Sequence, residues 1–402
     1  NGQVQALRAD TLESLWVSEK LGGQTLTPLT YKNGYLYTGT WSSEIKVGNY
    51  FCLAVADEDT TQTTETKYCK WKMEHKGGFY WAGSYATDNY IIFGSDDGDA
   101  GNTAQSAILY SVNPISGEII DMIEGVKGDI RSTVSYDSQT DRIYFTTKGG
   151  EFYQIKVNKD GKFDDSKTKV FNLGGMSTGT PLVYNGLAYL GVSGPNQFSQ
   201  TGHSYKIIDV TTTPMKEVGT ADIPGYVQTS ALLSTAYHTA TNKIYVYATY
   251  NFKPGGIYII EVEKTNGKDA DNAAIVNVSG SHLYMPDGDK QEHCICSLVS
   301  DRNGVIYYKN DSGYLMAVAP KPLNGKAITA FHIGDRTGVI NETSKTVTVT
   351  VASNVDVTSL TPAITVSENA TVSPNSGVAT NFTNPATYTV TAQDGGTQAY
   401  TV

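Results

Sequence analysis

A strand pattern that recurs about every 54 residues constrains the fold of this chain more than any other feature. A short apolar–aromatic run marks the second strand of each unit. Its marker position falls at residues 37, 92, 144, 189, 245 and 307, so the mean spacing is (307−37)/5, or about 54 residues. Five of these six markers are Tyr and the remaining one is Ile92. Self-similarity at this period is typical of propellers and solenoids.

The repeating unit is clearest between residues 128 and 172. Ile130–Tyr136 alternates polar and apolar residues, Arg142–Thr147 is rich in β-branched and aromatic residues, and Glu151–Val157 alternates again. Turn-forming residues separate these runs, and Thr168–Asn172 follows, which indicates a four-stranded antiparallel sheet. One such sheet cannot bury both of its faces, whereas radial stacking buries them and leaves only short edges. The sequence therefore predicts an all-β chain that forms a β-propeller.

The number of blades depends on how the two ends of the propeller are interpreted. Val4–Arg8 and Leu12–Val17 resemble the third and fourth strands of a unit that lacks its first two. Five full units follow, and Gln291–Ala319 supplies three more strands. We favour seven blades with an incomplete first blade, because Asn1-Gly2 has the character of a hairpin end. Six blades result instead if the amino-terminal fourth strand closes the last sheet.

The composition changes after Lys321–Gly325, a segment whose Pro, Asn and Gly suit a domain boundary. Beyond it Thr, Val, Ser and Asn dominate. Five strands are expected there: Ile328–Ile333, Thr346–Val351, Ala363–Val366, Tyr388–Ala392 and Gln398–Val402. Frequent strands and turns over about 75 residues are typical of a small immunoglobulin-like β-sandwich. We therefore predict a β-propeller over residues 1–322 and a β-sandwich over residues 326–402.

Composition and charge exclude several classes of partner. The net charge is −10 and the isoelectric point is about 5.1, whereas nucleic acids and anionic membranes are bound by basic surfaces. No apolar run in the sequence approaches the length that spans a bilayer. We therefore expect no nucleic-acid partner and no membrane insertion by this chain.

The four cysteines leave the redox compartment open. Cys52 and Cys69 fall on the third and fourth strands of one unit, so they form either a cross-strand disulfide or two unpaired core thiols. We favour the unpaired thiols. Cys294 and Cys296 lie two residues apart on one strand, where a disulfide between them would be strained. Their spacing is not that of a structural zinc site.

Several segments of residues 1–320 resemble known propeller repeats. NGQVQALRADTLESLW and TPLVYNGLAYLGVSG are similar to the quinoprotein-type (pyrroloquinoline-quinone-like) repeat. GGFYWAGSYA, GDIRSTVSYD and GGMSTGTPLVY resemble segments of secreted cell-surface propeller proteins of anaerobic Gram-positive bacteria. The tail from Ser359 to Val402 resembles the immunoglobulin- or cadherin-like modules of gut-bacterial surface proteins. The resemblance implies an extracellular adhesion-type protein, secreted or held at the cell surface.

The residues argue against an enzyme. Quinoprotein dehydrogenases commonly hold their quinone on calcium, between a tryptophan and a disulfide of adjacent cysteines, but this chain has no Cys-Cys pair. A propeller glycosidase or lyase would need paired carboxylates that converge on the axis. The segments that approach the axis carry mainly Thr, Ser, Gly and aromatic residues. We interpret their few acids, Asp129, Asp222 and Glu292, as turn or capping residues.

The entry loops of a propeller line the mouth of its central channel, where pockets form. Tyr80, Trp81, Arg131, Tyr226 and Gln228 occur at this level of their repeats. Aromatic side chains there can stack on sugar rings or anchor a peptide, and Arg131 can clamp a carboxylate. The alternative interpretation is that these five residues fill the channel and join neighbouring blades.

One loop is a candidate metal site. Asp96, Asp97, Asp99 and Asn102 place three carboxylates and an amide on a Gly-rich loop between strands. Oxygen ligands suit calcium, which extracellular proteins use to stiffen loops. The loop lacks the EF-hand spacing, and the alternative interpretation is a solvated turn. Apart from this calcium, the sequence indicates no cofactor.

The sequence thus predicts a non-enzymatic, monomeric extracellular protein that acts in adhesion or binds a glycan or protein through the propeller face. A rigid scaffold that only presents other modules is the first alternative. A quinone-dependent dehydrogenase, or a propeller glycosidase or lyase, is the second. The sequence does not identify the ligand.

Overall fold

The computed structural model describes residues 2–62, 64–101, 104–196, 199, 201–320 and 323–402. The protein is all-β, as predicted, with 47% of residues in strands and 2% in helices. The helical elements are α1 (His238–Thr241) and the short 3-10 turn η1 (Gly288–Lys290). The chain divides into two compact units, Asn1–Val318 and Ala319–Val402. No helix in the described ranges is long and apolar enough to cross a membrane.

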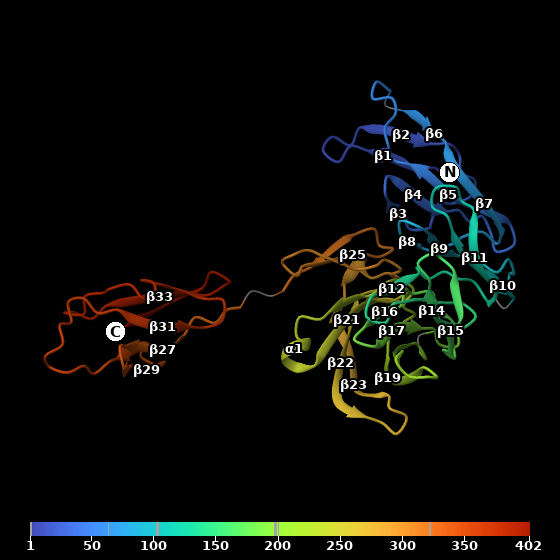
Figure 1. The fold of residues 1–402 in the computed structure, drawn as a ribbon. Coiled ribbons are helices and arrows are strands. Elements are labelled where there is room, and N and C mark those ends of the chain that lie inside the picture. Colours follow the sequence, from blue (N-terminus) through green and yellow to red (C-terminus); the bar gives the residue numbers. More distant parts are fainter. Residues whose placement is uncertain (1, 63, 102–103, 197–198, 200, 321–322) are drawn as a thin grey trace. The chain divides into compact units, whose positions relative to one another are not determined.

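The N-terminal unit consists, among the described residues, of seven small sheets that we number in chain order (Figure 1). Sheet 1 contains β1 (Gln5–Leu7), β2 (Ser14–Ser18) and β6 (Glu65–Lys67). Sheet 2 contains β3 (Thr30–Lys32), β4 (Tyr35–Gly39), β5 (Val47–Ala54) and β7 (Cys69–Lys76). Sheet 3 contains β8 (Tyr85–Ala86), β9 (Ile91–Gly94), β10 (Gln105–Val112) and β11 (Ile119–Lys127).

The remaining sheets continue the same order. Sheet 4 contains β12 (Ser135–Asp137), β13 (Arg142–Thr146), β14 (Glu151–Val157) and β15 (Phe163–Asn172). Sheet 5 contains β16 (Leu182–Tyr184), β17 (Leu187–Val192), β18 (Ser204–Asp209) and β19 (Lys216–Asp222). Sheet 6 contains β20 (Leu232–Ser234), β21 (Lys243–Thr249), β22 (Ile257–Lys268) and β23 (Ala274–Tyr284). Sheet 7 contains β24 (Val299–Ser300), β25 (Ile306–Lys309) and β26 (Leu315–Val318).

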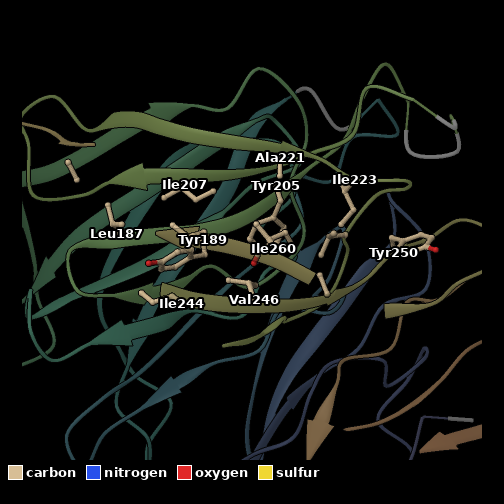
Figure 2. Packing of buried hydrophobic residues seen from close by; sticks show 14 residues of the cluster. Leu187, Tyr189, Tyr205, Ile207, Ala221, Ile223, Ile244, Val246, Tyr250 and Ile260 are labelled. Carbon is tan, nitrogen blue, oxygen red and sulfur yellow. The ribbon is translucent and has the colours of Figure 1, made fainter. Parts of the chain in front are cut away.

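Consecutive sheets share hydrophobic cores because both faces of their central strands are apolar. In β13, Ile143 and Phe145 belong to a core with sheet 3, whereas Tyr144 belongs to a core with sheet 5. This alternation follows from the two-residue period of side chains along a strand. Each junction from sheet 1 to sheet 7 has such a core, and Figure 2 shows the one between sheets 5 and 6. In the part of the chain described, no such core joins sheet 7 to sheet 1.

The junctions repeat one close contact at the end of the second strand. The segment that precedes the first strand of each sheet is called its approach segment. A Cβ atom added at Gly39 would lie 2.5 Å from Phe79, in the approach segment of the following sheet. A Cβ added at Gly94 would lie 2.2 Å from Ile130, and one added at Gly191 would lie 2.5 Å from Val227. Such distances leave no room for a side chain, so glycine allows the two sheets to approach this closely.

Threonine takes the glycine's place in sheets 4 and 6. Thr146 Oγ1 donates a hydrogen bond to the carbonyl oxygen of Ser177 (3.3 Å), and Thr249 Oγ1 donates to that of Cys296 (2.7 Å). Each acceptor lies in the approach segment of the next sheet. The same junction is therefore held either by close apolar packing or by a side-chain hydrogen bond.

Three details of the N-terminal unit differ from the sequence expectation or choose between alternatives. Strands β1 and β2 pair with each other and with β6, not with β24–β26, so the six-blade closure is not formed among the described residues. Strand β6, which pairs in parallel with β2, was not expected, since it is short and polar. Cys52 and Cys69 are free thiols, as favoured from the sequence.

The C-terminal unit contains two sheets around one core. One sheet contains β27 (Ile328–Ile333), β28 (Arg336–Thr337) and β31 (Pro362–Val366). The other contains β29 (Val339–Asn341), β30 (Thr346–Thr348), β32 (Thr371–Ser373), β33 (Thr387–Thr391) and β34 (Thr397–Thr401). Phe331, Val347 and Tyr388 are buried together in the core that both sheets share. The five strands expected in this region are all present. Four agree with the expected bounds to within one residue at each end, whereas β30 ends at Thr348 instead of Val351.

We expect Ile260→Ala to destabilise the N-terminal unit by about 2–5 kcal/mol, because Ile260 is fully buried between sheets 5 and 6 and its truncation leaves a cavity. The neighbouring strand offers a matched control, since Ile275 is 42% exposed and Ile275→Ala should change stability by no more than about 0.5 kcal/mol. Urea unfolding followed by tryptophan fluorescence measures both. Equal losses for the two variants would contradict the packing described here.

Candidate functional site: a cavity between the approach segments

A cavity of about 230 Å³ lies where the approach segments of the sheets meet. Six of the seven sheets contribute to it, from sheet 2 to sheet 7. Its lining residues are Leu26, Pro28, Trp81, Arg131, Thr133, Thr178, Thr180, Gln228, Thr229, Ser230, Ile295 and Ser297. The cavity is therefore built from parts of the chain about one repeat length apart.

The lining residues occupy equivalent positions of successive repeats. Ile130, Ser177 and Val227 make the junction contacts described above, and the residues one and three positions later line the cavity. These residues are Arg131 with Thr133, Thr178 with Thr180, and Gln228 with Ser230. In an extended segment, every second side chain points to the same face. The junction contacts and the cavity lining thus lie on opposite faces of the same segments.

An aromatic stack borders the cavity at sheet 3. The rings of Tyr80 and Trp81 stack with centroids 4.5 Å apart, and those of Tyr80 and Trp41 stack at 4.6 Å. Trp81 lines the cavity and has a φ angle of +61°. This left-handed conformation is unfavourable for a bulky residue and is concentrated at functional sites.

Beneath this stack, Arg131 is held by three carboxylates. Its Nη2 atom lies 2.6 Å from Glu44 Oε2 and 2.8 Å from a carboxylate oxygen of both Asp96 and Asp129. Its guanidinium carbon lies 4.5 Å from the centre of the Tyr80 ring. Asp96 and Asp129 have no exposed surface, and Arg131 is only 6% exposed. A buried charge needs such partners, because an unpaired one would be strongly destabilising.

The burial of this cluster shifts the pKa values of its members. Burial raises the pKa of Asp96 well above its usual range, although Arg131 opposes the rise. Burial alone would lower the pKa of Arg131, but Asp96, Asp129 and Glu44 outweigh it and raise that pKa. Burial also raises the pKa of the neighbouring Asp97 to about 6, and the nearby Asp129 contributes in the same direction.

The structure brings three of the five predicted ligand-binding residues to the cavity, namely Trp81, Arg131 and Gln228. Tyr80 lies behind them, in the stack with Trp81. Tyr226 is fully buried, and its hydroxyl donates a hydrogen bond to Thr178 Oγ1 (3.1 Å). Tyr226 therefore matches the alternative interpretation, in which a residue fills the interior. Gln228 accepts a hydrogen bond from Asn251, which orients its amide at the cavity.

The predicted calcium loop has its side chains turned to different partners. Asp96 faces Arg131, Asp97 Oδ1 accepts a hydrogen bond from the Asp99 backbone N–H (2.8 Å), and Asn102 lies outside the described residues. The alternative of a solvated turn is wrong for Asp96 and Asp97, which are 0% and 4% exposed. Calcium at this loop stays a prediction, which a shift in melting temperature on adding calcium to chelator-treated protein tests.

A second acidic group has the spacing of a metal site, but it surrounds an arginine. Ligand atoms of Glu44, Asp96 and Asp129 lie within 4.8 Å of one another. The guanidinium group of Arg131 supplies the positive charge at that point. Asp129, interpreted from the sequence as a turn or capping residue, does accept a hydrogen bond from the Asp97 backbone N–H at Oδ1 (2.9 Å). Its carboxylate is also buried in this cluster and lies 3.4 Å from Lys148 Nζ, which the sequence did not predict.

Sequence reasoning missed Glu44, Trp41 and the threonines of the cavity. Glu44 lies 87 residues before Arg131, and no local pattern relates the two. The threonines could have been found by aligning the approach segments, since Thr133 and Thr180 hold equivalent positions. In that alignment, a residue is recognised as part of the cavity by its position in the repeat and not by its residue type.

Comparisons with known proteins concern mainly the C-terminal unit. Residues 328–402 match the family model described as "SGBP, N-terminal", in which SGBP denotes a surface glycan-binding protein. This segment therefore resembles the N-terminal domain of such proteins. The match associates the chain with bacterial cell-surface proteins. No curated protein matches the chain.

Solved structures also match parts of the chain. A putative glycoside hydrolase from Bacteroides thetaiotaomicron is 30% identical over 21% of this chain and 26% of its own length, with a TM-score of 0.19. A chain of the Mitotic Checkpoint Complex is 10% identical over 79% of this chain and 82% of its own, with a TM-score of 0.46. The chain thus spans about a quarter of the hydrolase, and both TM-scores are too low to bear on fold or function. The quinoprotein-type and Gram-positive resemblances stay predictions.

We expect Arg131→Met to destabilise the N-terminal unit by about 3–5 kcal/mol, because it leaves buried carboxylates without their counter-charge. Adding Asp96→Asn and Asp129→Asn to this variant should recover part of the loss, since both buried charges are then removed. Arg302→Met, at an exposed position, is the control and should be nearly neutral. Urea unfolding measures the series, and no recovery in the triple variant would contradict the electrostatic explanation.

We expect Asp97→Asn to stabilise the protein above pH 6. The folded-state pKa of Asp97 is about 6, against an ordinary value of 3.8, so the folded state holds this proton more tightly than the unfolded state. The protonated Asp97 therefore contributes most to the free energy of unfolding below pH 4. This contribution is lost as the pH rises through 6, and the loss is at most about 3 kcal/mol. Thermal unfolding of both proteins from pH 4 to 8 checks this, and the difference in melting temperature should grow with pH and then level off. A constant difference across that range would show that Asp97 does not titrate there.

Proposed function

We propose that this chain is a non-enzymatic, surface-exposed glycan-binding protein that holds an uncharged saccharide in the cavity of its N-terminal unit. The unit is, in this proposal, a seven-bladed β-propeller with incomplete first and last blades. The C-terminal unit is an immunoglobulin-like sandwich of the kind that surface glycan-binding proteins carry. The observation that carries the proposal is the convergence of equivalent residues from successive repeats on one cavity that Trp81 borders.

Two features support the propeller. Six hydrophobic cores join consecutive sheets in chain order, as radial stacking requires. The approach segments of sheets 2 to 7 reach a common cavity, which side-by-side stacking in a line would not produce. A crystal structure with sheets 2 and 7 at opposite ends of an open stack would overturn the ring.

The chemistry of the cavity supports an uncharged sugar. Trp81 offers an aromatic ring of the kind that packs against the C–H face of a sugar, and hydroxyl groups of Thr, Ser and the amide of Gln228 can hydrogen-bond to sugar hydroxyls. Arg131 is the one charged residue of the described lining, and its charge is balanced by three carboxylates. An anionic ligand would therefore meet no net attraction there.

The same cluster supports a non-enzymatic role. Glycoside hydrolysis needs two carboxyl groups placed on either side of the scissile bond. Of the three carboxylates of this cluster, Asp96 and Asp129 are fully buried and paired with Arg131, so neither can contact a sugar. Glu44, whose side chain is 29% exposed, is also paired with Arg131, and one carboxyl group does not make the pair that hydrolysis needs. Adhesion and capture of a free glycan both fit this arrangement. A monomeric state stays a prediction.

The scaffold alternative differs in a single measurable way, because it requires no ligand in the cavity. A scaffold has no reason to keep a bulky residue at an unfavourable φ angle beside solvent-accessible hydroxyl groups. Binding of a saccharide that depends on the cavity residues would exclude it.

We expect the full chain to bind at least one uncharged oligosaccharide of a plant and mucin glycan panel, and Trp81→Ala to weaken that binding at least about 10-fold, or about 1.4 kcal/mol. Tyr31→Ala is a matched control, because Tyr31 is an exposed aromatic residue of β3 that does not line the cavity. Isothermal titration calorimetry measures both variants. The panel is also checked for hydrolysis products, which should be absent. Equal affinity in the two variants, or release of sugar, would refute the proposal.

A further inference from the structure

The approach segment of sheet 3 is one residue longer than those of sheets 4 and 6. In sheet 4, Ile130 makes the junction contact and β12 begins five residues later, at Ser135, and sheet 6 has the same spacing. In sheet 3, Phe79 makes that contact, but β8 begins six residues later, at Tyr85. Trp81 lies in this longer segment, with its φ angle of +61°. An extra residue in an extended segment bulges it and re-aims a side chain, so the insertion accounts for the position of the indole ring at the cavity.

The wall of the cavity has a polar part and an apolar part. The described lining residues from the consecutive sheets 4, 5 and 6 are all polar, with Arg131, Thr180 and Gln228 as one example from each sheet. Sheets 2, 3 and 7 contribute the apolar residues Leu26, Pro28, Trp81 and Ile295, together with Ser297. A ligand that fills the cavity therefore meets hydrogen-bonding groups over one part of its surface and aliphatic and aromatic groups over the rest.

The aliphatic side chains of the apolar part do not belong to the sheet cores. Leu26 and Ile295 are 43% and 42% exposed, whereas their neighbours Thr27 and Cys294 are buried. Because successive side chains of an extended segment point to opposite faces, Leu26 and Ile295 point away from the cores and towards the cavity that they line. A ligand that removes these two side chains from water gains the corresponding hydrophobic stabilisation.

The polar part is held in place by hydrogen bonds within the protein. Thr180 Oγ1 accepts a hydrogen bond from the Thr133 backbone N–H (3.3 Å), and Gln228 Oε1 accepts one from Asn251 Nδ2. Both side chains keep hydrogen atoms that can donate to a sugar oxygen, because a hydroxyl group and an amide group are donors as well as acceptors. A site formed in advance loses less conformational entropy on binding.

The division of the wall bears on the kind of sugar that the cavity can hold. Its volume of about 230 Å³ is below the range of about 300–1,000 Å³ that is usual for drug-sized ligands, so it suits one sugar unit and not a chain. A hexose such as glucose or galactose carries hydroxyl groups around its whole rim. A hydroxyl group placed against Leu26 or Ile295 would lose its hydrogen bonds with water and gain none. A methyl group at that position would instead bury apolar surface.

We propose that the cavity is specific for an uncharged sugar unit that carries a methyl group at its rim, as 6-deoxy sugars and N-acetyl sugars do. The proposal rests on the glycan-binding function proposed above and names the class of sugar for that same site. The indole ring of Trp81 stacks on the C–H face of the sugar, and the polar groups of sheets 4 to 6 bind its hydroxyl groups. The methyl group packs against Leu26 and Ile295.

The test compares two pairs of free sugars by NMR titration of the full chain: L-fucose with L-galactose, and N-acetyl-D-glucosamine with D-glucose. The first pair differs only in the hydroxyl group at carbon 6, and the second in the replacement of a hydroxyl group by an acetamido group. The methyl-bearing member of at least one pair should bind about 10-fold more tightly or more, since apolar pockets discriminate by about 10- to 100-fold against one added hydroxyl group. The pair that shows this preference tells whether the site takes the 6-deoxy or the N-acetyl group.

Two double variants assign the preference to the aliphatic side chains. Leu26→Ser/Ile295→Ser should reduce it to less than about 2-fold, because the apolar surface that covers the methyl group is removed. Leu29→Ser/Val299→Ser is the matched control and should keep the preference, since Leu29 and Val299 are exposed aliphatic residues close by in the same sheets that do not line the cavity.

The inference is overturned if neither pair shows a preference, or if Leu26→Ser/Ile295→Ser retains it. If an uncharged saccharide of the glycan panel still binds in a manner that depends on Trp81, the proposed function stands and the methyl specificity alone fails. If none of these sugars and no saccharide of the panel binds, both proposals fail together.

Discussion

The close approach of consecutive sheets at the ends of their second strands is the constraint on which the rest of the N-terminal unit depends. At Gly39, Gly94 and Gly191 there is no space for even a methyl group, because Phe79, Ile130 and Val227 fill it. Each of these apolar residues is part of an approach segment, and the neighbouring residues of the same segment face the cavity. Packing at the junctions therefore sets the position of the cavity lining. One face of each approach segment packs into the core between the sheets, and the other face lines the cavity.

Charge pairing, rather than charge content, determines what the cavity can bind. Arg131 is the most conspicuous cation near the cavity, yet its charge is matched by carboxylates within 3 Å. Coulomb attraction to a ligand depends on this local balance, because the surrounding charges are closer than a screening length. The overall charge of −10 does not describe this balance.

Much of the fold could be predicted because the strand signal is local and repeated. Ile328–Ile333 was predicted with its observed bounds, and the strands of sheet 4 follow the predicted alternation. The short strand β6 escaped notice because Glu65–Lys67 is polar and pairs with β2, which lies about 50 residues earlier. The partners of Arg131 were also beyond prediction, since Glu44 reaches it from another sheet. Side chains that meet only through tertiary packing leave no periodic signal in the sequence.

The candidate site differs in this respect from the fold, because its geometry comes from a chain of contacts and not from one pattern. Three carboxylates fix Arg131, the guanidinium group lies against Tyr80, and Tyr80 stacks on Trp81. Tyr80 covers one face of Trp81, and these contacts help to offset the cost of the left-handed backbone at Trp81. A residue that merely filled space could adopt an ordinary conformation at no such cost. The buried ion cluster is therefore best understood as the support that holds an aromatic ring at the cavity.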